Sequence, residues 1–224
     1  MKIIALLPMK GHSERVPNKN LRIFNDVPLF HVILKKLDKV ELINEIIINT
    51  DSDIVSDSAI SMSKKVKIHK RIPELCGDLI PMNEIINYDI NNSDGDFYIQ
   101  THSTNPLLKV ETINNALQFF QNNITDYDSV YSVTKRQARF YFENMKAVNH
   151  NPNELLRTQD LPPLFEENSC FYIFSKESFK SNSNKRIGKR PHIFKMNKLE
   201  SVDIDENDDF ILAELIHKNF PEYQ

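Results

Sequence analysis

Cysteine, glycine and long apolar runs are all scarce in this chain of 224 residues. The two cysteines, Cys76 and Cys170, lie far apart and have no metal-type spacing, so we expect a reduced, cytoplasmic setting. The longest apolar runs, such as Ile3–Leu7 and Ile46–Ile48, are far too short to cross a bilayer, so a membrane protein is not favoured. The N-terminal run is also too short for a signal peptide, and we interpret it as a buried first strand.

The sequence also lacks an excess of charge, internal repeats and Gly/Ser linkers. A formal net charge of −3 argues against a nucleic-acid-binding protein but leaves room for a local basic pocket. Apolar residues make up 40% and charged residues 26%, close to the globular average, so disorder is not favoured either. We therefore expect one domain over residues 1–224.

Short β-branched stretches alternate with segments of helical periodicity, which predicts an α/β fold with a mostly parallel sheet and helices on both faces. Such sheets bind ligands at the carboxyl ends of their strands, which places a site in the loops after Leu7, Thr50 and His102. A last amphipathic helix is expected at Asp209–Lys218. The other predicted strands are Ile46–Thr50, Val66–His69, Phe97–Thr101, Val130–Val133 and Cys170–Phe174, and the other predicted helices cover about 28–40, 53–64, 81–91 and 109–121.

The segment of about 134–169 breaks this pattern, because much of it is irregular, polar and rich in Asn, Arg and Pro. It fits an arm that reaches a partner subunit, and it equally fits a long surface loop.

The first predicted strand ends in a polar loop, Pro8 to Asn20, that carries three basic residues, a glycine and a serine. Such a loop can aim backbone amides and cations at a polyphosphate. It contains neither a P-loop motif nor a Gly-x-Gly-x-x-Gly fingerprint, so those two nucleotide-binding families are disfavoured. A solvated surface turn is the alternative.

Near the end of the chain, Ser201 to Glu206 contains the pattern Asp-x-Asp. Alternation along a short strand would put Asp203 and Asp205 on one side, where two carboxylates together with substrate phosphates would bind Mg²⁺. The alternative is a pair of exposed acids before a helix N-terminus, which favours negative charge.

Taken together, four blocks in the same order resemble the CMP-sialic acid synthetase, or acylneuraminate cytidylyltransferase, family. The opening block retains Pro8, Gly11, Ser13, Pro17, Lys19 and Asn20 of the family pattern. The other three blocks are Arg71 to Asp78 with one residue inserted, Arg157 to Pro162 followed by Glu167-Asn168-Ser169, and Asp203 to Phe210.

The resemblance implies a Rossmann-like nucleotidyltransferase fold with a dimerisation arm at about 134–169, and a homodimer. It implies that Lys10 and Lys19 contact the triphosphate of CTP, and that Asp203 and Asp205 hold Mg²⁺. It also implies that Asn20 and Arg71 hold the cytidine, while Gln159 and Asn168 bind substrate and belong to the block where the arm crosses toward the partner subunit's active site. A solvated turn is the alternative for Arg157, Gln159 and Asp160.

The sequence departs from the family pattern on both sides of the site. In the triphosphate loop, Lys10 replaces an arginine and keeps the charge. On the acceptor side, Ser169 replaces a glycine, and the family's Gln-Pro-Thr-Ser-Pro-Leu-Arg corresponds here to His102 to Leu108. We hypothesise that His102 donates to the carboxylate of the acceptor; a structural hydrogen-bonding histidine is the alternative.

The implied reaction is attack of the anomeric hydroxyl of a sialic-acid-like 2-keto sugar acid on the α-phosphorus of CTP, with release of pyrophosphate. The acceptor could also belong to a different class. A second hypothesis is a metal-dependent nucleotide-sugar glycosyltransferase with Asp203 and Asp205 as its metal motif, and a third is a non-catalytic nucleotide-sensing module.

Overall fold

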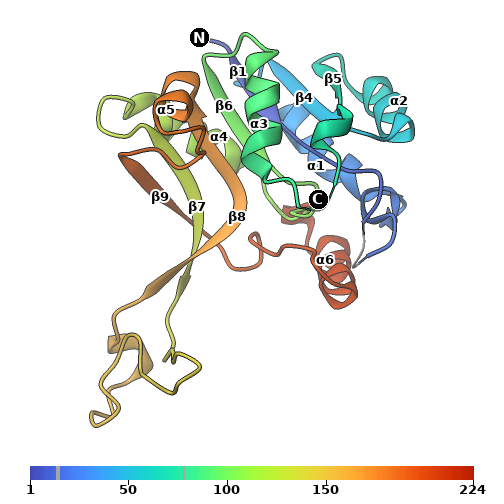
Figure 1. The fold of residues 1–224 in the computed structure, drawn as a ribbon. Coiled ribbons are helices and arrows are strands. Elements are labelled where there is room, and N and C mark those ends of the chain that lie inside the picture. Colours follow the sequence, from blue (N-terminus) through green and yellow to red (C-terminus); the bar gives the residue numbers. More distant parts are fainter. Residues whose placement is uncertain (14–15, 78) are drawn as a thin grey trace.

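The computed structural model describes residues 1–13, 16–77 and 79–224 and contains a seven-stranded sheet with helices on both faces (Figure 1). Within the described residues, β8 is the one strand of this sheet that runs antiparallel to its neighbours, β6 and β7. The predicted α/β fold with a mostly parallel sheet is therefore confirmed. In spatial order the strands are β5 (Val66–Lys70), β4 (Glu45–Thr50), β1 (Ile3–Leu6), β6 (Phe97–Thr101), β8 (Leu164–Ser175), β7 (Ser129–Arg136) and β9 (Pro191–Met196).

The central strands are buried on both faces, which is why they read as continuous apolar runs. Along β1, Ile3 and Ala5 pack into the larger core cluster with α1 (Leu29–Lys39), α2 (Asp53–Met62) and α4 (Val110–Asn122). The alternate residues Ile4 and Leu6 pack on the other face with α3 (Met82–Asn91) and α5 (Lys176–Ser181). The period of two along each strand thus fixes which helix each side chain meets.

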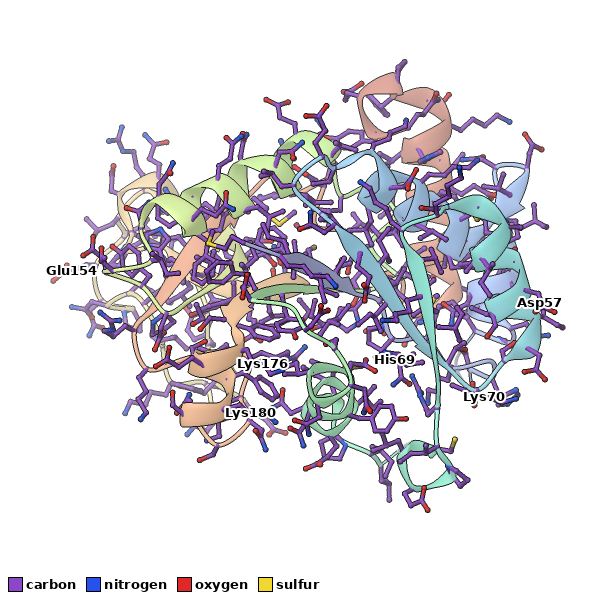
Figure 2. All side chains as sticks on the ribbon, turned by 90° about the horizontal axis from the view of Figure 1, so that it is seen from above. Asp57, His69, Lys70, Glu154, Lys176 and Lys180 are labelled. Carbon is purple, nitrogen blue, oxygen red and sulfur yellow. The ribbon has the colours of Figure 1, made fainter. Side chains whose placement is uncertain are left out.

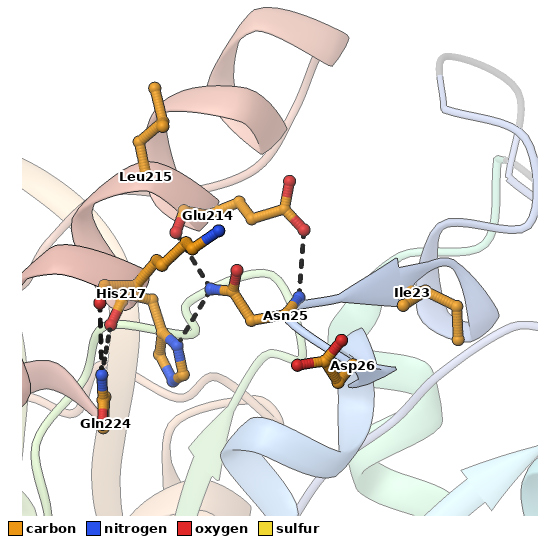
Figure 3. A pocket seen from close by; sticks show the side chains of 8 residues that line it. Ile23, Asn25, Asp26, Glu214, Leu215, His217 and Gln224 are labelled. Atoms are coloured by element: carbon orange, nitrogen blue, oxygen red, sulfur yellow. Dashed lines mark hydrogen bonds between the residues drawn. The ribbon is translucent and has the colours of Figure 1, made fainter.

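A small hairpin, β2 (Ile23–Phe24) and β3 (Val27–Pro28), holds the last helix, α6 (Asn207–Asn219), against the body. Phe24 packs edge to face on Phe210 of α6, and the Asn25 side chain donates to the Glu214 carbonyl at 2.9 Å (Figure 3). A cavity of about 590 Å³ lies between the two elements. At this cavity Asn25 bonds to both Glu214 and His217 (Figure 3). These contacts fix the position of α6, which begins two residues after Asp205.

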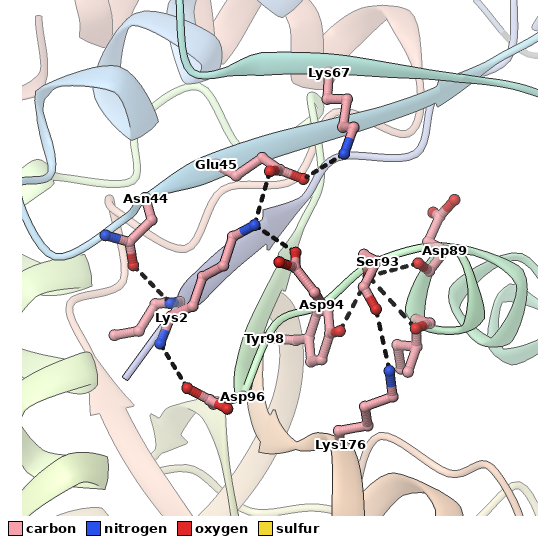
Figure 4. Close-up of polar contacts among 12 residues, drawn as sticks. Lys2, Asn44, Glu45, Lys67, Asp89, Ser93, Asp94, Asp96, Tyr98 and Lys176 are labelled. Atoms are coloured by element: carbon pink, nitrogen blue, oxygen red, sulfur yellow. Dashed lines mark hydrogen bonds and ion pairs between the residues drawn. The ribbon is translucent and has the colours of Figure 1, made fainter.

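At the amino ends of β1, β4 and β6, charged residues pair with one another (Figure 4). Lys2 Nζ lies 3.0 Å from Glu45 and also contacts Asp94, while Lys67 approaches Glu45 at 3.7 Å. Both carboxylates raise the pKa of Lys2. These side chains form ion pairs with one another, at the end of the sheet opposite the predicted site.

Residues 137–163 form a projection that leaves the body between β7 and β8 (Figure 1). The two strands stay paired as they leave, down to Arg136 opposite Leu164, and beyond them are an isolated bridge and the 3₁₀ turn η3 (Thr158–Asp160). The remaining 3₁₀ turns are η1 (Lys19–Leu21), η2 (Pro73–Leu75) and η4 (Pro221–Tyr223). Among the described residues, no helix is both long and apolar enough to cross a membrane.

Candidate active site

The loop after β1 is fastened to its neighbours by close backbone contacts. Gly11 donates its N–H to the Asp51 carboxylate at 2.6 Å, and a Cβ on this glycine would lie 2.9 Å from that of Ser52, so a side chain does not fit here. The amide of Asn20 donates to the Lys10 carbonyl at 2.9 Å and accepts from the Ser103 hydroxyl at 2.6 Å. Asn20 therefore ties the two ends of the loop to the residues that follow β6.

This loop and the end of β6 enclose a cavity of about 330 Å³. The parallel strands β1 and β6 bring their carboxyl ends together here, as predicted for a sheet of this kind. Glu14 and Arg15, the latter counted among the basic residues of the loop, lie outside the described residues, and His12 is exposed. The cavity is lined by Pro8, Met9, Lys10, Ser13, Lys19, Asn20, Met82, His102, Ser103 and Thr104, so four of the predicted site residues share it.

Lys19 is held against the acidic segment at the other end of the chain. Its Nζ donates to the Ile204 carbonyl at 2.6 Å, between the two aspartates. The Ile204 N–H in turn donates to the Thr104 carbonyl at 2.9 Å. The segment lies outside the strands, contrary to our expectation of a short strand, yet Ile204 is buried while Asp203 and Asp205 are half-buried.

Asp203 carries the one feature of this segment that points to a cation. Its Oδ1 is buried and has no hydrogen-bond partner, which is unusual for a carboxylate oxygen. Burial raises the pKa of Asp203, and the neighbouring Asp205 raises it further, while a hydrogen bond from Thr104 and the charge of Lys19 oppose them. No group of three or more His, Cys, Asp or Glu side chains in the described parts of the chain is arranged to hold a metal alone.

Beyond the two aspartates, Asp209 completes the N-terminal cap of α6. It accepts the N–H groups of Asp205 and Glu206, at 3.1 and 2.8 Å, in a capping box with Glu206. Phe210, the next residue, anchors the helix to the body, since it is buried in the cluster around Phe24.

His102 is a neutral histidine held by Gln100. The Gln100 amide nitrogen lies 2.9 Å from His102 Nε2, and because an amide NH₂ only donates, Nε2 accepts and the proton sits on Nδ1. Burial lowers the pKa of His102 to about 4, and the charges of Arg186 and Lys19 contribute in the same direction. His102 therefore serves at neutral pH as a donor through Nδ1 rather than as a cation.

Arg71 is buried beneath the loop and uses its donors on the protein. Its Nε donates to the Asn49 side chain at 2.9 Å, and its Nη2 donates to the backbone carbonyls of Asn49 and Met9. Asn49 and His69 both bond to the Asp89 carboxylate, at 2.7 and 2.8 Å. Arg71 thus supports the backbone at the start of the loop; its contact with cytidine stays a prediction.

Replacing Asp89 by alanine should lower the free energy of unfolding by about 2–4 kcal/mol, because Asn49 and His69 would lose a buried acceptor. The matched control is Asp57→Ala on the exposed outer face of α2 (Figure 2), which should change stability very little. Urea unfolding measures both. Equal stability of the two variants would contradict the supporting role of this network.

A model of the family described as cytidylyltransferase matches residues 4–217, nearly the whole chain. The chain belongs to this cytidylyltransferase family. The resemblance found in the four sequence blocks is therefore confirmed.

Curated relatives agree with this assignment. The chain is 28% identical over 220 residues to N-acylneuraminate cytidylyltransferase A of Danio rerio, covering 95% of this chain and 50% of that protein. It is 26% identical to N-acylneuraminate cytidylyltransferase of Streptococcus agalactiae, covering 94% and 52%. The chain thus spans about half the length of these relatives. It is 24% identical to post-translational flagellin modification protein B of Campylobacter coli, covering 97% and 95%.

Two solved structures share the fold with this cytidylyltransferase family member. One is a CMP:2-keto-3-deoxy-manno-octonic acid synthetase in complex with CTP, with a TM-score of 0.69 and 11% identity, covering 97% of this chain and 99% of that one. The other is a 4-diphosphocytidyl-2C-methyl-D-erythritol synthase of Anaerococcus prevotii, with a TM-score of 0.68 and 12% identity, covering 97% of each chain. The predicted nucleotidyltransferase fold is confirmed.

Besides Arg71, Asp203 and Asp205, two further predicted site residues of this cytidylyltransferase family member are not among those that line the cavity. Gln159 is exposed on the projection, and Asn168 donates its amide to the Thr134 hydroxyl at 3.0 Å. Asp78, the last residue of the Arg71 block, lies outside the described residues. The sequence analysis assigned no role to Arg186, which lies beside Gln100; among four basic residues between 185 and 190, nothing in the sequence singled it out.

Proposed function

We propose that this chain transfers CMP from CTP to a sialic-acid-like 2-keto sugar acid and releases pyrophosphate. The observation that carries the proposal is one cavity lined by Lys10, Lys19 and His102, in which Lys19 bonds to the carbonyl of Ile204, between Asp203 and Asp205. The family assignment and the names of the curated relatives support the nucleotide and the acceptor class.

In this proposal Lys10 and Lys19 bind the triphosphate and stabilise the charge that grows on its oxygens as pyrophosphate leaves. Lys19 is held in place before substrate arrives by its bond to Ile204, so little reorganisation is needed. Asn20 keeps the loop closed on the nucleotide, and Arg71 supports it from below.

Asp203 and Asp205 are the residues that would hold Mg²⁺. The buried Asp203 oxygen without a hydrogen-bond partner fits a cation, and two carboxylates with substrate phosphates are a usual magnesium environment. When bound, Mg²⁺ supplies charge stabilisation to the phosphate oxygens. The proximity of Lys19 keeps a second fixed cation beside this position.

Pyrophosphate release from each of the four nucleoside triphosphates, with a panel of 2-keto sugar acids, tests the proposal. We expect release with CTP and at least one acid, and none when the acid is omitted. Release only with a nucleotide other than CTP, or with acceptors outside the sugar acids, would overturn it. Cys76 and Cys170 are both free, which fits the cytoplasmic setting that we propose for this reaction.

We further propose that the projection of residues 137–163 pairs two copies of the chain and brings Gln159 to the partner's site. Large apolar side chains are exposed along it: Leu155 is 96% exposed, Met145 76% and Phe142 56%. Apolar exposure on this scale marks an interaction surface.

Replacing Met145 and Leu155 together by glutamate should convert the wild-type dimer into a monomer, because buried charges are costly. Light scattering after gel filtration gives the mass. The matched control replaces Ile54 and Ile60 of α2, which are also exposed, by glutamate, and should stay dimeric. A monomeric wild-type protein would contradict the pairing.

A further inference from the structure

Arg186, in the loop between α5 and β9, holds a half-buried guanidinium over two neighbouring strands. Its guanidinium carbon lies 4.0 Å from the centre of the Tyr172 ring, and its Nη1 donates to the Gln100 side-chain oxygen at 2.5 Å. Tyr172 and Gln100 are cross-strand partners on β8 and β6 and are both buried. The guanidinium plane is therefore positioned by two side chains that the sheet itself holds in register.

This cation makes no ion pair with any carboxylate among the described residues. Burial lowers the pKa of Arg186, and Tyr172 and the nearby Glu167 oppose this, but the Glu167 carboxylate accepts a hydrogen bond from the Tyr172 hydroxyl. Two other arginines, Arg136 and Arg157, each pair with an acid. Since desolvated charges are usually paired, a guanidinium with only neutral partners is suited to an anion from outside the chain.

Gln100 connects Arg186 to the cavity. The same side-chain amide accepts from Arg186 and donates to His102, which lines the cavity beside Lys19. His102 lies close enough to Arg186, Lys19 and Asp205 for all three charges to act on it. An anion bound at Arg186 would therefore lie next to the place proposed for the triphosphate.

We propose that Arg186 binds the carboxylate of the acceptor acid beside His102. This inference rests on the proposed function and adds to it the residue that selects for an acid. The guanidinium fork matches a carboxylate in a bidentate pair, which a lysine could not supply in the same way. The Nδ1–H of neutral His102 is available as a further donor to the acceptor.

The first test compares Arg186→Met and Arg186→Lys with wild type in steady-state pyrophosphate release, using the sugar acid that gives most release with CTP. Arg186→Met keeps an apolar stem on Tyr172. It should raise the KM for the acid about 10- to 100-fold and leave the KM for CTP unchanged, because a charged hydrogen-bonded contact is lost. Arg186→Lys should recover part of this loss.

The matched control is Arg190→Met, four residues further on, where the side chain is exposed and donates to the Thr125 carbonyl. It should leave both KM values unchanged. A second substrate, the same acid with its carboxylate reduced to an alcohol, distinguishes recognition of the carboxylate from a general effect of the substitution on the structure. Wild type and Arg186→Met should have the same KM for this alcohol. An equal rise in KM for acid and alcohol, or no change in the KM for the acid, would overturn the inference.

A second measurement uses the wild-type protein and does not depend on whether the variants fold. An arginine-specific dicarbonyl reagent is applied with the acid, the alcohol or CTP present, and modification of Arg186 is read by peptide mass spectrometry. The acid should protect Arg186 and the alcohol should not; modification at the same rate with and without the acid would overturn the inference. If no sugar acid releases pyrophosphate from CTP, the proposed function itself fails, and this inference falls with it.

Discussion

Replacing Lys19 by alanine should lower kcat about 100- to 1000-fold, the usual cost of removing one fixed donor from a developing oxyanion. Lys19 lines the cavity, and its Nζ is fixed by the Ile204 carbonyl at 2.6 Å, so its charge is preorganised. In free-energy terms the loss is about 2.7–4 kcal/mol of transition-state stabilisation. Steady-state pyrophosphate release with CTP and the preferred acid measures it.

Two comparisons separate this loss from a loss of folding. Lys39→Ala removes an exposed lysine at the end of α1 and should keep wild-type kcat. Lys19→Arg keeps the charge and should retain more activity than Lys19→Ala. Thermal unfolding checks that all three variants are folded. Normal binding of CTP and normal turnover by Lys19→Ala would show that the phosphate assignment is wrong.

Replacing Asp203 by asparagine should lower the magnesium-dependent rate by about 100- to 1000-fold without destabilising the fold. Burial and Asp205 raise the pKa of Asp203 above its unfolded value, so the folded chain binds this proton more tightly than the unfolded chain does. Near pH 7 the ionised carboxylate therefore costs stability, and this cost is lost as the pH falls through the raised pKa to below the unfolded one. A neutral asparagine removes the cost.

In metal-free buffer, then, Asp203→Asn should unfold at the same temperature as wild type or higher. Added Mg²⁺ should raise the unfolding temperature of wild type, because it binds only the folded chain, and should leave that of the variant unchanged. Asp208→Asn, in the exposed first turn of α6, is the control and should respond as wild type does. An Asp203→Asn variant that keeps its magnesium-dependent rate would contradict the metal assignment.

The core of the fold was predictable because its strands are buried on both sides. Runs such as Ile3–Leu6 and Ile46–Ile48 have no polar face, which indicates a parallel sheet covered by helices. The edge strand β9 was missed because only Met196 of its six residues is fully buried, so Pro191–Met196 carries no clear pattern. The six-residue helix α5 was missed because it is too short to show helical periodicity.

The site was predictable where its functional residues are grouped in short segments of the sequence. The loop to Asn20 and the pair Asp203 and Asp205 stand out by residue type and by their resemblance to a known family, and the structure brings Lys19 to Ile204 across 185 positions of sequence. Arg186 could not be found in this way. It is one basic residue among several in a surface loop, and only its packing on Tyr172 and its bond to Gln100 distinguish it.

The most direct test of the central claim follows the α-phosphorus of CTP. The wild-type chain is incubated with Mg²⁺, the preferred 2-keto sugar acid, and CTP radiolabelled at either the α- or the γ-phosphorus. The account predicts that the α label moves to a CMP-linked acid while the γ label appears only in pyrophosphate. Transfer of the γ label to the acid, or no acid-dependent movement of the α label, would contradict it.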